Sequence, residues 1–390
     1  MIVSIEEGIK RILDSKVKYK TELLPLENAN NTISAKTLKA SLSLPRFDNS
    51  AMDGYAIKGD AKSYKIVGKI LAGENKDYDL KDGECIKITT GAKCPKSADS
   101  VIPQENCKIF DESIEIEKSV KKGANIRREG EDIKKDEVII NKGDKITSNF
   151  IQLLSSQGIT HIEVYQSVKV AIFASGSELK MPYEELNGAE IYNSNTPYLI
   201  ARAKELGCEV TFVGKSQDNL EDMKDMIENS LGHDIIITSG GVSVGEADFT
   251  KEAFKSFGFE PIFEKVKIKP GKPTTLGKIG DSFVLNLPGN PLAASLNFEV
   301  FGKVLIDHLS GINKPALRAI KAKISQDFSK NRAVTTVIPG FFDGEQFEIA
   351  KKFGPNMVNV LNHCNGFIIV DEEIQQIKKD EIVEFFPINL

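Results

Sequence analysis

A glycine-rich stretch followed by two carboxylates is the part of this sequence best suited to bind a ligand. Residues 234–248 read DIIITSGGVSVGEAD, and the three isoleucines at 235–237 predict a strand that is buried on both faces. Glycines at 240, 241 and 245 allow the backbone to turn sharply and approach a ligand closely. Main-chain N–H groups between the end of such a strand and the next helix bind phosphate or another oxyanion.

The two acids that end this stretch, Glu246 and Asp248, add carboxylate oxygens, which divalent cations prefer as ligands. Carboxylates beside an oxyanion site suggest a bridging metal ion. The local pattern also fits an ordinary strand-to-helix turn, with the glycines serving only conformation and Asp248 serving as a helix N-cap. The stretch alone leaves both interpretations open.

Three other polar segments suit ligand binding. Residues 41–60, SLSLPRFDNSAMDGYAIKGD, crowd turn-forming polar residues around small ones without a helix or strand period, which predicts a loop. Residues 266–278, VKIKPGKPTTLGK, place lysines beside two prolines that fix the backbone, which favours a positioned cationic loop over a flexible lysine-rich surface. Residues 126–132, IRREGED, are by themselves typical of a solvated charged loop.

The elements expected to position the glycine-rich loop alternate between strand and helix. Strands are predicted at 168–174, 209–214 and 234–238, and helices at 196–207 and 218–232. This order predicts a doubly wound, mostly parallel sheet with right-handed crossovers. Loops carrying Glu178, Asp218 and the glycines follow three of these strands, so we expect them to converge at the carboxyl edge of the sheet. A rigid PGNP turn and another helix follow a further strand.

The remaining segments predict smaller domains. Ser4 and Glu7 form a capping-box pattern ahead of an amphipathic helix, and residues 147–159 regain helical spacing. Between about residues 64 and 138, short alternating runs separated by turn residues predict strands of a small barrel or sandwich. Short alternating runs separated by turn residues occur again after about residue 311 and predict a second small β domain.

Composition narrows the classes of function. A chain of 390 residues predicts two to four domains, and a formal net charge of -5 argues against a general nucleic-acid binder. No apolar run approaches the ~20 residues of a membrane span, and the N-terminus resembles no targeting peptide, so a cytoplasmic location is expected. Five scattered cysteines without a C-x-x-C pair predict reduced thiols, and four widely spaced histidines give little support to a histidine-rich metal centre.

Six motifs occur in a fixed order along the chain: FDNSAMDGYA, TTGA, REGEDI, SGGVSVGEAD, KIKPGKP and LPGNP. In this order they resemble the molybdopterin molybdenumtransferases, the family that includes the E domain of gephyrin. The six together are far more specific than any one of them, because the α/β part alone also resembles the smaller molybdopterin adenylyltransferases.

The resemblance implies four domains. They are a discontinuous N-terminal domain (1–43 and 138–165), an inserted β domain (44–137), an α/β molybdopterin-binding domain (166–312) and a C-terminal β domain that is barrel-like (313–390). It also implies a homodimer in which the α/β domain of one subunit and the inserted domain of the other share an active site.

The family's reaction joins molybdate to adenylylated molybdopterin and yields molybdenum cofactor and AMP. The resemblance implies Mg²⁺ bound by Asp218 and Asp248, which neutralises developing charge. Catalytic roles are implied for five residues: Asp53, Thr90, Asp132, Asp218 and Asp248. Substrate-binding roles are implied for Arg127, Glu178, Ser239, Gly240, Gly241, Ser243, Gly245, Lys269, Lys272, Pro288 and Pro291.

Two other functions remain open at this point. The chain could be an adenylyltransferase or another nucleotide-handling enzyme of the same α/β superfamily, although the FDNSAMDGYA and REGED motifs argue against this. It could also be a non-catalytic scaffold, as the gephyrin relationship suggests, but no partner motif is visible. Transient contact with other cofactor-biosynthesis proteins is expected, and no membrane or nucleic-acid partner.

Overall fold

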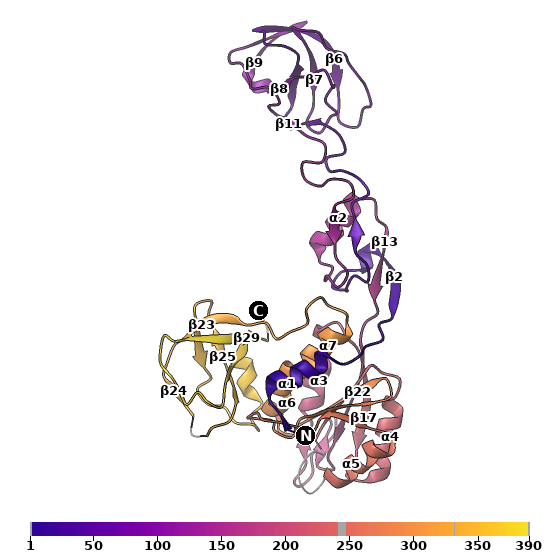
Figure 1. Cartoon of the computed structure of the whole chain (residues 1–390), viewed down its shortest axis with the longest axis vertical. Coiled ribbons are helices and arrows are strands. Elements are labelled where there is room, and N and C mark those ends of the chain that lie inside the picture. The colour runs from indigo at the N-terminus through magenta and orange to yellow at the C-terminus, as the bar shows by residue number, and fades with distance from the viewer. Residues whose placement is uncertain (1, 241–246, 331, 389–390) are drawn as a thin grey trace. The chain divides into compact units, whose positions relative to one another are not determined.

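The computed structural model describes residues 2–240, 247–330 and 332–388, without the side chains of 247–249 (Figure 1). The chain divides into two compact units. The first unit comprises Met1–Ala35, Gly143–Thr147 and Ile162–Leu390, and the second comprises Lys36–Lys142 and Ser148–His161. No helix in the described part of the chain is long and apolar enough to cross a membrane.

A six-stranded sheet forms the centre of the first unit. Its strand order is β17-β14-β18-β22-β21-β19; the first four strands are parallel, and β21 runs antiparallel to both of its neighbours, β22 and β19. The bounds are β14 Lys169–Ser175, β17 Glu209–Ser216, β18 Ile235–Ser239, β19 Glu260–Phe263, β21 Thr275–Ile279 and β22 Ser282–Leu287. The predicted doubly wound, mostly parallel sheet is confirmed. Every residue of β18 is buried, which explains its unbroken run of isoleucines.

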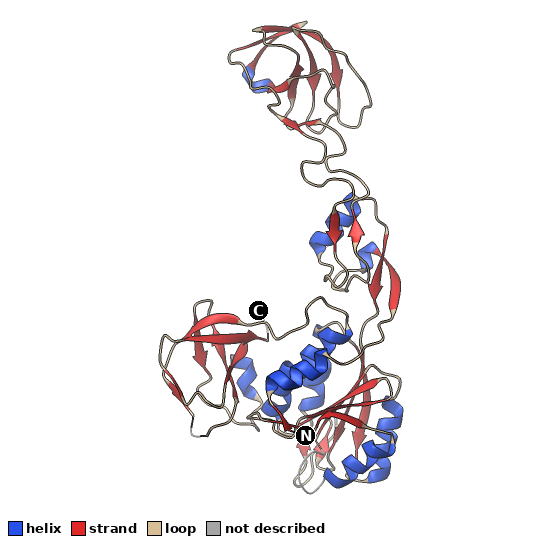
Figure 2. Ribbon diagram, viewed as in Figure 1, coloured by secondary structure: helices blue, strands red, loops and turns tan. Residues whose placement is uncertain are grey.

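Helices cover both faces of this sheet (Figure 2). Their bounds are α1 Ile5–Leu13, α3 Asn195–Glu205, α4 Leu220–Ser230, α5 Ala247–Ser256, α6 Pro291–Asn297, a π-helical turn Phe298–Gly302 and α7 Lys303–Leu309. One core lies between the sheet and α4 and α5, and a larger core lies between the sheet and the other helices. The predicted first helix is confirmed, with the Ser4 side chain accepting the N–H of Glu7 at 3.2 Å.

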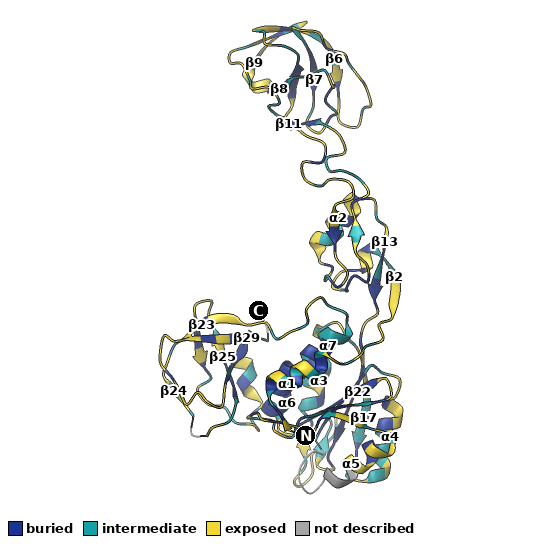
Figure 3. Cartoon of the chain, viewed as in Figure 1, coloured by how far each residue is buried: buried dark blue, intermediate teal, exposed yellow. Residues whose placement is uncertain are grey.

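A closed β-barrel ends the first unit, in agreement with the predicted C-terminal β domain. Its strand order is β23-β26-β25-β27-β29, with bounds β23 Ile320–Ile324, β25 Thr336–Phe342, β26 Gln346–Ile349, β27 Gly366–Val370 and β29 Ile382–Pro387. Two-stranded pairs add β1 Ile2–Val3 to β20 Lys265–Val266, β2 Thr21–Pro25 to β13 His161–Tyr165, β15 Leu179–Lys180 to β16 Ile191–Tyr192, and β24 Phe328–Ser329 to β28 Gln376–Ile377. Buried residues mark the interiors of both the barrel and the central sheet (Figure 3).

The second unit is built around another six-stranded sheet, ordered β8-β5-β7-β6-β10-β9. Its strands are β5 Gly54–Ile57, β6 Ser63–Ile70, β7 Glu84–Ile88, β8 Ser100–Pro103, β9 Cys107–Phe110 and β10 Ser113–Ile116. The unit also contains the pairs β4 Asn49–Ser50 with β11 Ile126–Arg127 and β3 Leu38–Lys39 with β12 Val138–Ile140, and helix α2 Ser148–Ser156.

The prediction that residues 41–60 form only a loop is wrong. The segment contains β4 and the whole of β5, which lies between β8 and β7 with all four residues buried. A short strand buried on both faces shows no alternation of apolar and polar residues, and the surrounding turn residues hide it further.

Candidate functional site

The carboxyl ends of β17, β14, β18 and β22 meet at one edge of the central sheet, because these four strands are parallel. Hydrogen bonds join the loops that follow β14 and β17. The Oδ2 atom of Asp218 accepts the N–H of Ser177 at 2.8 Å, and the N–H of Gly176 donates to the Ser216 carbonyl at 3.4 Å. The predicted convergence of these loops is therefore confirmed.

The loops after β18 and β22 are joined through Asn195, at the start of α3. Its Nδ2 atom donates to the Ser239 hydroxyl at 2.7 Å and to the Gly289 carbonyl at 2.8 Å. The Ser239 hydroxyl in turn donates to the Pro288 carbonyl at 3.2 Å. Sequence reasoning missed Asn195, since only its position at a helix start hinted at a role.

Gly240 is required at this edge by both its conformation and its surroundings. Its φ is +96°, and a Cβ atom there would lie 2.3 Å from the Ser175 carbonyl oxygen. The glycine therefore brings the β18 loop directly against the β14 loop. Gly241, Ser243 and Gly245 lie outside the described residues, and so does the side chain of Asp248, whose backbone belongs to α5.

Two buried oxygen atoms at this edge have no hydrogen-bond partner among the described residues: Oδ1 of Asp218 and Oγ of Ser175. An unpaired buried polar atom costs about 1–3 kcal/mol, so a bound ligand or ion would remove a penalty. The Glu178 carboxylate belongs to the same turn, because a Cβ atom on Gly176 would lie 2.7 Å from its Oε2 atom.

These carboxylates fit Mg²⁺, which is commonly bound by one or two carboxylates together with waters and substrate phosphates. Within residues 2–240, 247–330 and 332–388, no group of three or more His, Cys, Asp or Glu could hold a metal ion. Asp218, with one oxygen unpartnered, is the described residue best suited to bind such an ion.

The cationic loop, residues 269–272, follows β20. The main chain of Lys269 pairs with the barrel segment, donating to the Thr335 carbonyl and accepting from Val337, both at 2.9 Å. The side chains of Lys269 and Lys272 are exposed, and no described carboxylate forms an ion pair with either. Pro291 is the first residue of α6.

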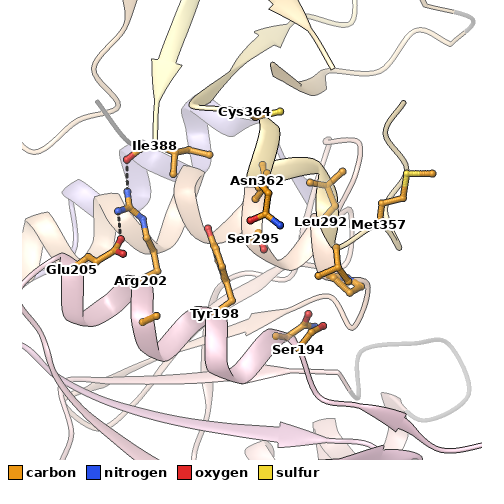
Figure 4. Close-up of a pocket in the computed structure, with 15 residues that line it drawn as sticks. Ser194, Tyr198, Arg202, Glu205, Leu292, Ser295, Met357, Asn362, Cys364 and Ile388 are labelled. Carbon is orange, nitrogen blue, oxygen red and sulfur yellow. Dashed lines mark hydrogen bonds and ion pairs between the residues drawn. The ribbon is translucent and has the colours of Figure 1, made fainter. Parts of the chain in front are cut away.

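A pocket of about 260 Å³ lies between α3, α6 and residues 357–364 (Figure 4). Asn195 and Pro291 line it, so it adjoins the loops at the sheet edge. On its wall Arg202 pairs with Glu299 at 2.7 Å and donates to the Ile388 carbonyl at 2.8 Å. With its guanidinium engaged in this way, Arg202 is not available as an anion-binding cation.

In the second unit, the structure brings Asp53 and Thr90 together. The main-chain N–H and the hydroxyl of Thr90 donate to Oδ1 of Asp53 at 2.6 and 3.0 Å. These two bonds, the main-chain bond first, lower the pKa of Asp53 and keep it ionised. The side chain is exposed, so its other oxygen faces solvent.

The other predicted residues of this unit are exposed on neighbouring segments. Arg127 lies on β11 opposite Asn49 of β4, and the N–H of Asp132 donates to the Leu44 carbonyl at 3.0 Å. The prediction that Asp53 and Asp132 meet the sheet edge of another subunit stays a prediction.

An acid that had no assigned role, Asp48, organises the REGED segment. Arg128 donates to its Oδ2 atom at 2.6 Å, and the N–H of Glu129 donates to its Oδ1 atom at 2.8 Å. Burial opposes ionisation of Asp48, but these two donors outweigh it and lower its pKa. Because its partner lies 80 residues away, sequence spacing could not reveal this ion pair.

A parallel α/β sheet with glycine and carboxylate loops at its carboxyl edge defines a class of proteins that bind phosphate-bearing ligands. Residues 171–308 match the family described as "Probable molybdopterin binding domain", and residues 3–158 match "MoeA N-terminal region (domain I and II)". Proteins named molybdopterin molybdenumtransferase from Staphylococcus epidermidis and Staphylococcus aureus are 33% identical, over 94% of this chain and 93% of theirs. The chain therefore belongs to the molybdopterin molybdenumtransferase family.

Solved structures agree with this assignment. Two crystal structures of the molybdopterin biosynthesis MoeA protein from Pyrococcus horikoshii match with TM-scores of 0.84 and 0.87 and sequence identities of 28% and 26%. The matches cover 100% and 99% of this chain and 100% of each of the other chains.

Proposed function

We propose that this protein is a transferase that completes molybdenum cofactor synthesis by transferring molybdenum from molybdate to adenylylated molybdopterin, with release of AMP. One observation carries the proposal: similarity to molybdenumtransferases extends over 94% of the chain. An adenylyltransferase of the same superfamily would account only for the α/β part, and a non-catalytic scaffold would need neither carboxylates nor a cationic loop.

The loops at the sheet edge divide the substrate between them. Ser239 and Gly240, together with the glycines that follow, receive the phosphate of the pterin substrate, because main-chain N–H groups at a strand end favour anions. Lys269 and Lys272 receive molybdate, a dianion, through charge-assisted hydrogen bonds. Placing phosphate and molybdate side by side brings the two reactants into one site and reduces the entropy lost in the transition state.

Asp218 and Asp248 would hold Mg²⁺, which when bound neutralises charge on the phosphoanhydride and orients it. The Oδ1 atom of Asp218, which is buried and has no partner among the described residues, supports this assignment. Ser177 holds the other carboxylate oxygen, so the side chain is oriented before a ligand arrives. Glu178, from the same turn, is the second described carboxylate within this loop cluster.

The second unit would complete the site from a partner subunit. In this proposal the protein is a homodimer, and the partner contributes Asp53, Thr90, Arg127 and Asp132. The Asp53 carboxylate is held ionised by Thr90, which suits a residue that faces a metal ion or a cationic group. The cytoplasmic location and transient contacts with other cofactor-biosynthesis proteins stay predictions.

The test is AMP release by the purified protein. With adenylylated molybdopterin, Mg²⁺ and molybdate, we expect AMP and molybdenum cofactor; without molybdate we expect little AMP. Consumption of ATP with free molybdopterin would instead identify an adenylyltransferase. Absence of both reactions would favour the scaffold.

A matched pair of lysine variants tests the molybdate assignment. Lys272→Ala should raise the KM for molybdate by about tenfold or more, because a charge-assisted bond is lost. Lys267→Ala removes an exposed lysine from the same segment and should leave that KM unchanged. Equal effects of both variants would contradict a specific role for Lys272.

A further inference from the structure

A buried asparagine, Asn297, supports the cationic loop, residues 269–272. Its side chain is fully buried at the end of α6. Its Nδ2 atom donates to the Pro270 carbonyl at 3.0 Å and to the Ala293 carbonyl at 2.7 Å, and its Oδ1 atom accepts the Thr274 hydroxyl at 3.0 Å. One amide therefore ties the loop to the helix through both its donor and its acceptor.

The contact between Asn297 and the loop is so close that only glycine fits at residue 271. Gly271 has a φ of +107°, and a Cβ atom there would lie 1.9 Å from Nδ2 of Asn297. Either feature alone would disfavour another residue. The loop conformation and the asparagine are thus fitted to one another.

Every carbonyl of the loop is bonded within the protein. The acceptor–donor pairs are Lys269 with Val337 at 2.9 Å, Pro270 with Asn297 at 3.0 Å, Gly271 with Thr274 at 3.0 Å and Lys272 with Val266 at 2.9 Å. The main-chain N–H groups of Gly271 and Lys272 have no acceptor among the described residues. The loop thus keeps donors for an oxyanion while its carbonyl oxygens, which would repel one, are occupied.

Asn297 is itself held firmly. A π-helical turn, Phe298–Gly302, follows it directly and carries the buried Glu299. Glu299 pairs with Arg202 of α3 at 2.7 Å, and Arg202 also donates to the Ile388 carbonyl at 2.8 Å, as Figure 4 shows for the latter bond. A supporting residue fixed by its own hydrogen-bonded neighbours can hold a binding loop accurately.

We propose that Asn297 is a positioning residue for molybdate binding: it keeps the Pro270 carbonyl turned inward and the lysines of the loop in their binding arrangement. The inference rests on the proposed function and adds to it a residue that does not itself contact the oxyanion. Without the Nδ2 bond, the Pro270 carbonyl could turn toward the bound anion and weaken its binding.

The primary test compares the two KM values in Asn297→Ala and Asn297→Asp. Aspartate retains the size of the side chain and an acceptor for Thr274 but lacks both donors. We expect the KM for molybdate to rise about tenfold in both variants, equivalent to about 1.4 kcal/mol, with the KM for adenylylated molybdopterin and kcat at saturating molybdate little changed. Ser295→Ala, a change of another buried polar residue on the same helix, is the control and should match wild type.

A second experiment changes the loop residue of the same contact, Gly271. Gly271→Ala should also raise the KM for molybdate, and combining it with Asn297→Ala should add little, because both changes disrupt one contact. If the Asn297 variants do not fold in thermal unfolding measurements, the single Gly271→Ala variant is the test: an unchanged KM for molybdate in that variant would overturn the inference.

The outcomes separate the inference from the proposed function. Failure of wild-type protein to release AMP would refute the proposed function. An active wild type, together with variants whose KM for molybdate is unchanged or whose two KM values rise equally, would overturn the role of Asn297 alone.

Discussion

Asp53 and Asp218 show two ways of holding a carboxylate in this molecule. Asp53, in the second unit, has one oxygen bonded twice by Thr90 and an exposed side chain. Asp218, in the first unit, has one oxygen bonded by Ser177 and the other buried without a described partner. Among the described residues, Thr90 already bonds the Asp53 carboxylate, whereas Oδ1 of Asp218 has no partner and would gain one from a bound ligand or ion.

Of the two carboxylates, Asp218 should respond more strongly to a bound ligand. Burial without a partner lowers the stability of the free protein, and binding then recovers what folding lost. An exposed and already bonded carboxylate gains less from a partner. We therefore expect Asp218 to contribute more than Asp53 to the stabilisation of the folded protein by a bound ligand.

The largest expected effect is the loss of activity in Asp218→Asn. Removing this charge should lower kcat by about 10²–10³-fold, equivalent to about 2.7–4 kcal/mol, because the metal ion that would stabilise the developing charge loses a ligand. The folded protein should remain as stable as wild type or become more stable, since the half-buried side chain loses its charge while one of its oxygens is buried without a described partner. Steady-state kinetics and thermal unfolding measure both quantities.

The matched control is Asp225→Asn, which neutralises an exposed aspartate on α4. It should change neither activity nor stability. A loss of activity in Asp218→Asn that was accompanied by unfolding would indicate that Asp218 has a structural role and does not respond to a ligand.

The second expected effect is stabilisation by Mg²⁺. At about 100 times its Kd, an ion that binds only the folded protein adds about 2.7 kcal/mol to the free energy of unfolding. Thermal unfolding of wild type and Asp225→Asn should show this stabilisation, and Asp218→Asn should lose most of it. Equal stabilisation of all three proteins would place the metal elsewhere.

Sequence patterns predicted the elements better than the contacts between them. The α1 cap and the strands of the central sheet follow from local spacing, because a capping box and a buried apolar run act over a few residues. The sequence pattern did not reveal strand β5, because a strand that is buried on both faces shows no alternation of apolar and polar residues. The roles of Asn195 and Asn297 could not be predicted, because their partners, Gly289 and Pro270, are distant in sequence and a single asparagine forms no periodic pattern.

The third prediction concerns Thr90→Val, which removes one of the two donors to Asp53. The main-chain N–H of residue 90 remains, so kcat/KM should fall only several-fold. With the hydroxyl lost, the pKa of Asp53 should rise toward its ordinary value. The acid limb of the pH profile of kcat/KM should therefore move to higher pH.

The direction of the matching stability effect follows from the lowered pKa of Asp53. The stabilising bond is present above the pKa of the unfolded state and is lost as pH falls through the lower pKa of the folded state. Thr90→Val should thus lose stability at neutral pH but not in strong acid. Thr90→Ser, which retains the hydroxyl, is the control; a shifted acid limb in that variant would contradict the assignment.

The smallest expected effect is that of Ser175→Ala, the second unpartnered oxygen at the sheet edge. The Ser175 hydroxyl is buried and finds no partner among the described residues, so deleting it removes an unpaired polar atom and should leave the free protein as stable or slightly more stable. If the hydroxyl bonds to the substrate, the KM for adenylylated molybdopterin should rise several-fold while stability does not fall. An unchanged KM for adenylylated molybdopterin would show that the Ser175 hydroxyl does not bind the substrate. Ligand binding at this edge of the sheet would then depend on Asp218 and its neighbours, and the Ser175 hydroxyl would contribute to neither folding nor binding.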